Sequence, residues 1–383
     1  MSSNTNRISQ EKLLYIAFFL ILITQIRCIQ IFKFATTIIG ILLLILSTFQ
    51  AFYYIYLKQK KPFILLWILC YILLFFCYRT SGQRETLDLF IYSSVLSNHN
   101  VKKVNNHFLK VMSLSIIVVI ILAIFKIIPS APIIYRNESI RYSLGFSHPN
   151  TLGFLLFLIA SSLFIKYYST RKNIVLFPLI LLQTICLFIN KSRMCGILIS
   201  VICIIYLFNL IGFNKLKYIL NTKILKLIIT FSLIACLFIS IYLVKNYYRP
   251  WIIYLDAWSH GRIINAAAFI QKYPITLCGN KTVPDFTTNI EGWGAVYLDI
   301  GFLYCLIRKG TINTFFYIFI MMRNLCNAMR KKDYAVIIVL LLLIISLFFE
   351  SSALTWFYAF PLLFYFEADS VLQNIMKGVI RYR

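Results

Sequence analysis

Five short polar motifs interrupt an otherwise apolar chain, and each carries residues that could bind an anion or move a proton. They are Arg141-Tyr-Ser-Leu-Gly145-Phe-Ser-His148-Pro149-Asn150, Asn190-Lys-Ser192-Arg193, Ser259-His260-Gly261-Arg262, Asp299-Ile-Gly-Phe-Leu-Tyr-Cys-Leu-Ile-Arg308 and Phe349-Glu350. Arginine stays charged and can hold a phosphate through two parallel hydrogen bonds, whereas carboxylates and histidine can accept a proton. Together the motifs predict a site for an anionic substrate that also contains a general base.

The first motif stands where a helix is expected to begin. Pro149 suits the first turn of a helix, and either Ser147 or His148 could cap it. The unpaired N–H groups near Asn150 and the positive end of the helix dipole would then attract an anion. The alternative is an ordinary capped helix start, with Arg141 bound to lipid headgroups.

The second and third motifs each contribute an arginine. Ser192 is expected to cap the next helix, which places Arg193 at the positive end of a helix dipole, a conflict that a bound anion would resolve. A turn residue that snorkels to the membrane surface is the alternative. In the third motif, Arg262 is the residue that points to phosphate binding. His260 could act as an acid or base, or could donate a hydrogen bond to a phosphate, although a single loop histidine more often does neither.

Two carboxylates are candidates for the general base. Asp299 stands among apolar residues, where an acid is costly and tends to be functional; burial would raise its pKa and neighbouring arginines would lower it. Its alternative role is an ion pair with Arg308 or Arg262. Glu350 follows a long apolar run, and its alternative role is that of a solvated acid at a helix end.

The elements that must position these motifs are transmembrane helices. Of the 383 residues, 61% are hydrophobic and only 13% are charged, whereas soluble domains are about half apolar and about a quarter charged. The composition predicts an all-α polytopic membrane protein, with residues 1–383 forming one membrane domain. The net charge of +26 would favour nucleic acid in a soluble protein, but in a membrane protein basic residues first set the orientation. We therefore expect no nucleic-acid partner, and the scattered cysteines predict no metal site.

About twelve transmembrane helices are expected, because a helix needs about 20 apolar residues to cross the bilayer. The stretches are 8–26, 34–57, 62–78, 84–101, 108–128, 149–168, 172–190, 193–213, 223–244, 309–328, 334–350 and 354–371. The segment 84–101 is the weakest, but counting it as a span keeps the later basic clusters inside the cell, as the positive-inside rule requires. Both termini are then cytoplasmic, and all five motifs face the exterior of the plasma membrane.

Two exterior connections are long, 129–148 and 245–308, and functional residues are expected on them. Within the second connection, Trp293–Ile307 is apolar but is followed by Arg308 and Lys309. We expect this segment to be an interfacial helix that lies on, or dips into, the outer leaflet.

The order of the motifs resembles that of Gram-positive Wzy-type polymerases of capsular or exopolysaccharide repeat units, which belong to the O-antigen polymerase and ligase superfamily. The resemblance covers roughly residues 60–370. Its parts are Arg141 to Gly153, the Ser192-Arg193 turn, Gly261-Arg262 followed by Cys278-Gly279, Asp299 to Gly310, and Phe349-Glu350. Two positions depart from the family pattern: Ile300 stands where Asn is usual, and Cys278 stands where Phe is common.

The resemblance implies a metal-independent, inverting glycosyltransferase with no cofactor beyond undecaprenyl diphosphate, the lipid that carries its substrate. A growing glycan would move from this lipid to the non-reducing end of another lipid-linked repeat unit. Asp299 would be the base, with Glu350 or His260 in reserve. The diphosphate would be bound by Arg141, Gly145, His148, Asn150, Ser192, Arg193, Arg262 and Arg308, and Arg141 and Arg262 would also act in catalysis. Expected partners are lipid-linked repeat units, membrane lipids, and the flippase and chain-length regulator of the same pathway.

Other functions stay open. A flippase for lipid-linked oligosaccharides would explain many spans and exterior arginines, but it predicts charges inside the bundle and internal repeats. The spans 108–128, 149–168 and 223–244 carry almost no charge in their interiors. A glycan transferase of the O-antigen-ligase or teichuronic-acid type would share the expected site and differ in its substrate.

Overall fold

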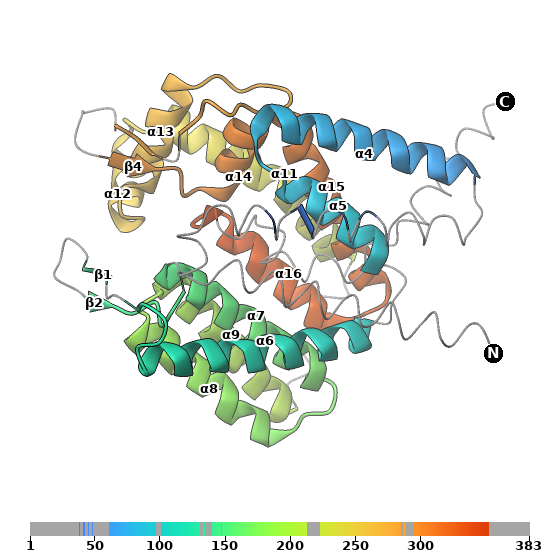
Figure 1. Cartoon of the computed structure of the whole chain (residues 1–383), viewed down its shortest axis with the longest axis vertical. Coiled ribbons are helices and arrows are strands. Elements are labelled where there is room, and N and C mark those ends of the chain that lie inside the picture. Colours follow the sequence, from blue (N-terminus) through green and yellow to red (C-terminus); the bar gives the residue numbers. More distant parts are fainter. Residues whose placement is uncertain are drawn as a thin grey trace. The chain divides into compact units, whose positions relative to one another are not determined.

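The computed structural model describes residues 61–96, 101–130, 133–134, 140–146, 148–212, 223–284, 286–288 and 295–351, with a few isolated positions between 38 and 48. The expected spans 8–26 and 354–371, and nearly all of 34–57, lie outside these residues. The chain divides into two compact units, whose helices and strands are labelled in Figure 1. The first comprises Met1–Tyr54 and His99–Leu216, and the second comprises Ile55–Asn98 and Lys217–Arg383. Each unit is described by itself.

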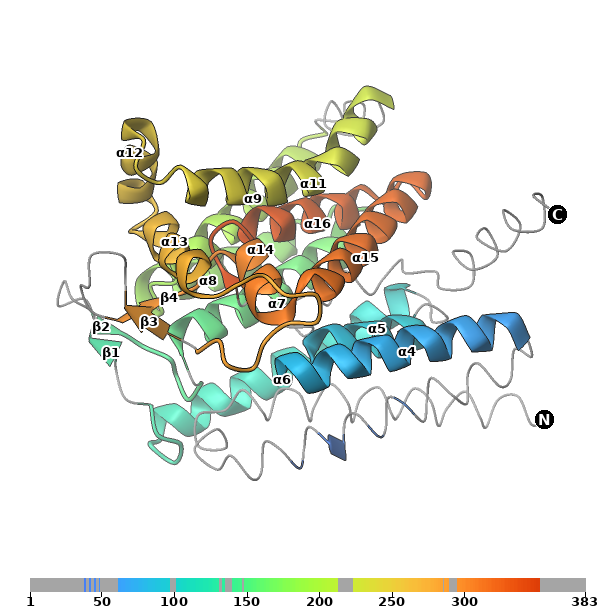
Figure 2. The same cartoon turned by 90° about the horizontal axis from the view of Figure 1, so that it is seen from above.

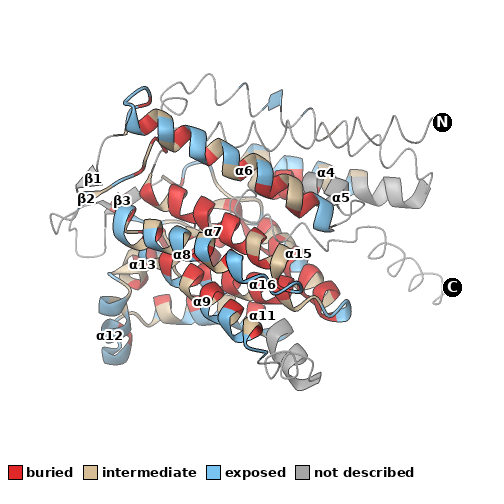
Figure 3. Ribbon diagram, turned by 90° about the horizontal axis from the view of Figure 1, so that it is seen from below, coloured by how far each residue is buried: buried red, intermediate tan, exposed pale blue. Residues whose placement is uncertain are grey.

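The first unit is built around α7 (Pro149–Tyr167), which is buried along most of its length (Figure 3). It packs against α6 (Val101–Ile124) and α9 (Arg193–Leu210). The chain between α7 and α9 forms η1 (Asn173–Val175), α8 (Leu176–Thr184) and the π-helical turn η2 (Ile185–Ile189). Before α7, β1 (Ile133–Ile134) pairs antiparallel with β2 (Ile140–Arg141), with Ile133 opposite Arg141.

The second unit combines long apolar helices with short elements that carry three of the motifs. Its elements are α4 (Lys61–Ser81), α5 (Glu85–Leu96), α11 (Lys223–Lys245), α12 (Pro250–Trp258), α13 (Arg262–Lys272), β3 (Phe286–Thr288), β4 (Ala295–Tyr297), α14 (Gly301–Tyr304), the π-helical turn η3 (Cys305–Lys309), α15 (Thr311–Arg330) and α16 (Tyr334–Ser346). β3 and β4 pair antiparallel, with Thr287 opposite Val296. One hydrophobic cluster joins the buried face of α13 to Ile252, Ile300 and Leu303.

Several helices suit a membrane environment. Among the described residues, α6, α7 and α9 are long and apolar enough to cross a bilayer. Residues Phe231–Lys245 of α11 pass the same test together with α12, which is bent away from α11 by 111° (Figure 2). Shorter apolar helices cover Ile68–Ser81, Asn173–Ile189 and Tyr334–Ser346, within or near expected spans. The prediction of an apolar, mostly helical chain with helices that could span a membrane is confirmed, while the number of twelve spans and their topology stay predictions.

The segment expected to form one interfacial helix, Trp293–Ile307, is built differently. Its described part forms β4, an extended stretch, the short helix α14 and the start of η3. Phe302, Leu303 and Ile307 are buried inside the second unit. A helix on a lipid surface would instead expose its apolar face, so this prediction was wrong: the apolar residues of the segment serve the core of the unit.

Candidate functional site

The second unit brings Arg262 and Glu350 together across 88 positions of the chain. Arg262 begins α13, Glu350 follows α16, and Nη2 of the arginine lies 3.0 Å from Oε1 of the glutamate. The two side chains are 22% and 10% exposed, so Glu350 is a partly buried, ion-paired group and not the solvated acid that was its alternative role. Nη1 of Arg262 is buried and has no hydrogen-bond partner among the described residues.

The start of α13 fixes the position of Arg262. Gly261 occupies the N-cap position with φ +80° and has no side chain with which to cap the helix. The carboxylate of Asp256, on α12, replaces that cap: its Oδ1 accepts hydrogen bonds from Ile263 N at 2.7 Å and Ile264 N at 3.3 Å. His260 lies in the intervening turn and is exposed. The third motif is therefore a short turn that places an arginine at a helix start.

Asp299 approaches Arg262 from the extended stretch before α14. The N–H of Gly301 donates to the carbonyl oxygen of Leu347 at 2.8 Å. A Cβ on Gly301 would lie 3.1 Å from the carbonyl oxygen of Glu350, so glycine allows this close approach. Burial raises the pKa of the Asp299 carboxyl, and the positive charge of Arg262 partly offsets that rise. The fourth and fifth motifs therefore each place a carboxylate near the Arg262 guanidinium.

Ile300, which stands where the family pattern has Asn, is a core residue. It precedes α14, and its side chain is buried in the hydrophobic cluster of the second unit. This position therefore contributes packing and no polar group to the site.

The first unit brings the first motif to the start of α7. His148 caps the helix, because its Nδ1 accepts a hydrogen bond from Asn150 N at 3.1 Å. Burial lowers the pKa of His148, and the positive charge of Arg141 lowers it further, which favours the neutral imidazole that this acceptor role requires. Gly145 has φ +89°, and a Cβ there would lie 3.1 Å from Cγ1 of Val119. The loop before α7 therefore packs closely against α6.

The second motif lies beside the first turn of α7. Ser192 occupies the N-cap position of α9 as expected, although its hydroxyl makes no capping hydrogen bond. A Cβ on Gly153 would lie 2.6 Å from Cβ of Ser192, so the positive ends of α7 and α9 are adjacent. Arg193 is exposed at the start of α9. Asn190 is fully buried, and neither polar atom of its side chain has a partner among the described residues.

Arg308 belongs to a second polar cluster of the second unit. Its Nη1 donates to the Tyr304 hydroxyl at 3.2 Å, and that hydroxyl lies 3.4 Å from Oε1 of Gln83. The adjacent Lys309 is 1% exposed, and its Nζ lies 3.6 Å from Oε2 of Glu85. The sequence did not predict this ion pair, because Lys309 was expected to be one of the basic residues on the exterior side of the membrane.

The Cys278-Gly279 pair serves packing in the same region. Gly279 and Gly310 have φ +85° and φ +90°, and a Cβ on either would meet the backbone of the other's segment. A Cβ on Gly279 would lie 2.5 Å from the carbonyl oxygen of Arg308 and 2.6 Å from Cβ of Ser81. The Thr80 hydroxyl donates to the carbonyl oxygen of Cys278 at 2.9 Å. Both glycines are needed because two loops and the end of α4 meet here.

No protein-family model matches the chain. Neither does a curated protein or a solved structure. The function therefore has to be inferred from the motifs and their geometry.

Within the described ranges, no three His, Cys, Asp or Glu side chains are grouped so that they could hold a metal ion. The expectation that the motifs of both units face one side of the membrane stays a prediction.

Proposed function

We propose that the protein is a polysaccharide polymerase of the plasma membrane. It transfers a glycan from undecaprenyl diphosphate to the non-reducing end of another lipid-linked repeat unit on the exterior face. The observation that carries this proposal is Arg262: its Nη2 pairs with Glu350, and its buried Nη1 has no partner among the described residues. The partly buried Asp299 lies near enough for its carboxylate to interact with the Arg262 charge. An unpaired guanidinium donor suits a phosphate oxygen, and a partly buried carboxylate with a raised pKa suits proton removal. The order of the motifs along the sequence supports the same activity.

In the proposed reaction, the acceptor hydroxyl oxygen attacks the anomeric carbon of the donor glycan. The bond from that carbon to the diphosphate oxygen breaks, and the diphosphate leaves with the bonding electrons. The hydroxyl proton passes to Asp299, whose raised pKa makes it a stronger base than an exposed aspartate. The Nη1 donor of Arg262 stabilises the negative charge that develops on the leaving group. Attack opposite the leaving group inverts the anomeric centre, and Glu350 or His260 is the reserve base.

The first unit supplies a further anion site in this proposal. The starts of α7 and α9 are adjacent, so their positive dipole ends lie together, close to Arg141 and Arg193. Both substrates of the reaction are lipid diphosphates, so a polymerase has use for more than one such site. About twelve spans with cytoplasmic termini would put these residues outside the cytoplasm.

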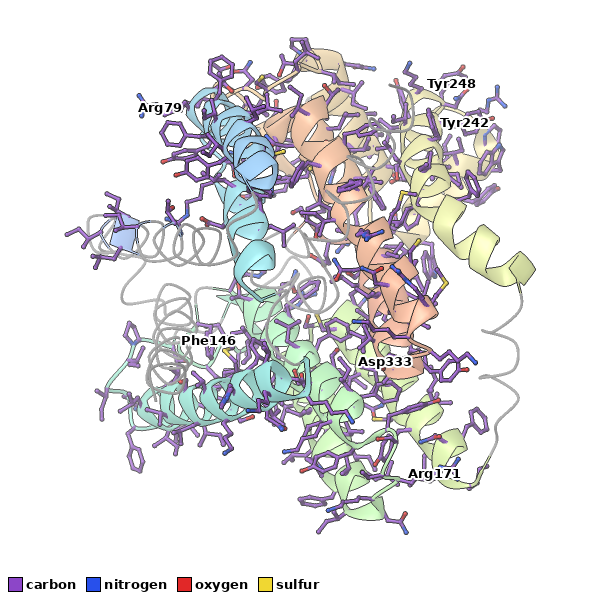
Figure 4. The ribbon with its side chains drawn as sticks, turned by 90° about the vertical axis from the view of Figure 1, so that its right-hand side faces the viewer. Arg79, Phe146, Arg171, Tyr242, Tyr248 and Asp333 are labelled. Carbon is purple, nitrogen blue, oxygen red and sulfur yellow. The ribbon has the colours of Figure 1, made fainter. Side chains whose placement is uncertain are left out.

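Lysine substitutions test the proposed diphosphate contacts. Arg141→Lys, Arg193→Lys and Arg262→Lys keep the charge but lose the two-pronged hydrogen bonding of arginine. We expect shortened polymer in cells that carry each variant, together with single lipid-linked repeat units on the exterior leaflet. Arg171→Lys, in the turn after α7 (Figure 4), is the matched control and should give polymer of normal length.

Normal long chains from all three motif variants would contradict the proposed diphosphate contacts. Accumulation of the repeat units on the inner leaflet would instead indicate a flippase.

A further inference from the structure

The helix α12 presents a stripe of aromatic side chains that are largely exposed within the described part of the chain. Trp251, Tyr254 and Trp258 follow at intervals of three and four residues and therefore share one helix face. Their exposed fractions are 50%, 79% and 70%. Ile252 and Asp256, on the opposite face, are respectively buried in the hydrophobic cluster and bound to the start of α13. Figure 3 shows how much of the α12 surface is exposed.

The surroundings of α12 are typical of a membrane–water interface. The chain turns through 111° between α11 and α12, and the turn contains Arg249. Nη1 of Arg249 donates to the Tyr242 hydroxyl at 3.0 Å, and the Tyr242 ring stacks on Trp251 with 6.5 Å between the centroids. Tyr248 is exposed beside them (Figure 4). Tyrosine, tryptophan and basic residues concentrate where a membrane protein meets the headgroups.

We propose that α12 is the interfacial helix of this protein, with Trp251, Tyr254 and Trp258 in the boundary between headgroups and acyl chains. Phospholipid is the expected occupant of this face because α12 directly follows the 23-residue apolar helix α11, which we expect to cross the bilayer. The sharp turn between them directs α12 along the membrane surface. With nine residues, α12 is about 14 Å long, which is too short to cross a hydrocarbon core of about 30 Å.

This arrangement links the membrane surface to Arg262. Asp256 holds the start of α13 from the inner face of α12, and the exposed Trp258 ring packs edge-on against Phe349, next to Glu350. The depth of α12 therefore sets the height of the Arg262–Glu350 pair above the hydrocarbon. This consequence rests on the proposed function, whereas the lipid contact of α12 does not.

Quenching of tryptophan fluorescence by brominated phospholipids tests the lipid contact. The full-length protein would carry Trp67→Phe, Trp293→Phe and Trp356→Phe, together with either Trp258→Phe or Trp251→Phe, so that one tryptophan remains on α12. In vesicles of phosphatidylcholine and phosphatidylglycerol, we expect each remaining tryptophan to lose fluorescence. Bromine near the carbonyl end of the acyl chain should quench more strongly than bromine near its terminus.

The control is a protein whose only tryptophan comes from Gln271→Trp, an exposed position on α13, and it should not be quenched. If removing all other tryptophans prevents folding, the difference between wild type and Trp258→Phe reports the same quantity. Absence of quenching on α12 would overturn the proposal in favour of water or a protein partner. Stronger quenching by the deep bromine would overturn it in favour of a re-entrant helix. Quenching does not depend on enzymatic activity, so failure of a polymerase assay would not affect the conclusion about the lipid contact of α12.

Discussion

At the scale of single residues, Asp299 combines a cost in stability with its proposed role as the general base. Burial raises the pKa of its carboxyl despite the nearby Arg262, so the folded protein holds this proton to a higher pH than the unfolded chain does. Stability from this group is therefore present below the pKa of the unfolded chain and is lost as pH rises through the folded pKa. The same shift gives the proposed base a stronger affinity for the acceptor proton.

Asp299→Asn should therefore separate stability from activity. The variant loses the base but also loses a poorly solvated charge, so we expect it to be at least as resistant to thermal unfolding as wild type at neutral pH. Its advantage should grow as pH rises from about 4 to neutrality, where the wild-type carboxylate ionises. Thermal unfolding in detergent across this pH range measures the effect. A variant that unfolds much more readily than wild type at neutral pH would indicate that Asp299 is structural.

At the scale of elements, the sequence predicts the beginnings of helices better than the function of apolar segments. Pro149 with His148 and Ser192 indicated the starts of α7 and α9, because N-terminal helix signals are local. Residues 295–307 were misplaced because apolar side chains suit a protein core and a lipid surface equally. The contacts of Asp256 with α13 and of Lys309 with Glu85 were missed because each depends on the fold, not on the local pattern.

Gly279→Ala should disrupt the junction of the loops and α4. The new Cβ would meet the backbone of Arg308, and the left-handed conformation disfavours alanine. Together these effects should cost about 3 kcal/mol or more. Gly212→Ala is the matched control: it has φ +82° but no neighbouring atom within 4 Å, so only the conformational cost of about 1 kcal/mol remains. Thermal unfolding compares the two, and equal losses would contradict the packing role of Gly279.

At the scale of the whole molecule, we expect most of the net charge of +26 to come from basic residues that set the orientation of the protein in the membrane. In the proposed topology most basic clusters fall on the cytoplasmic side and set the direction of the spans, and a few exterior arginines would serve the proposed function. The sequence predicted the apolar, helical character of the protein because composition alone determines it. It did not predict the pairing of Arg262 with Glu350, which depends on how segments 88 positions apart pack together.

Reporter fusions test the proposed orientation. An alkaline phosphatase reporter, which is active only outside the cytoplasm, should be inactive after Lys60 or Lys217 and active after Asn137 or Lys281. The fusion after Asn137 tests whether 84–101 crosses the membrane. With 84–101 counted, the number of spans between Lys60 and Asn137 is odd, so the loop lies outside. An inactive Asn137 fusion would show that 84–101 does not cross and would overturn the proposed topology.

Polymerisation by the purified protein tests the central claim most directly. The protein would be reconstituted in lipid vesicles with a single lipid-linked repeat unit as donor and acceptor, and the products would be separated by length. Wild type should form chains of several repeat units and release undecaprenyl diphosphate, whereas Asp299→Asn should form none above background. Failure of folded wild-type protein to lengthen any chain would contradict the proposed polymerase activity, and undiminished turnover by Asp299→Asn would remove Asp299 as its base.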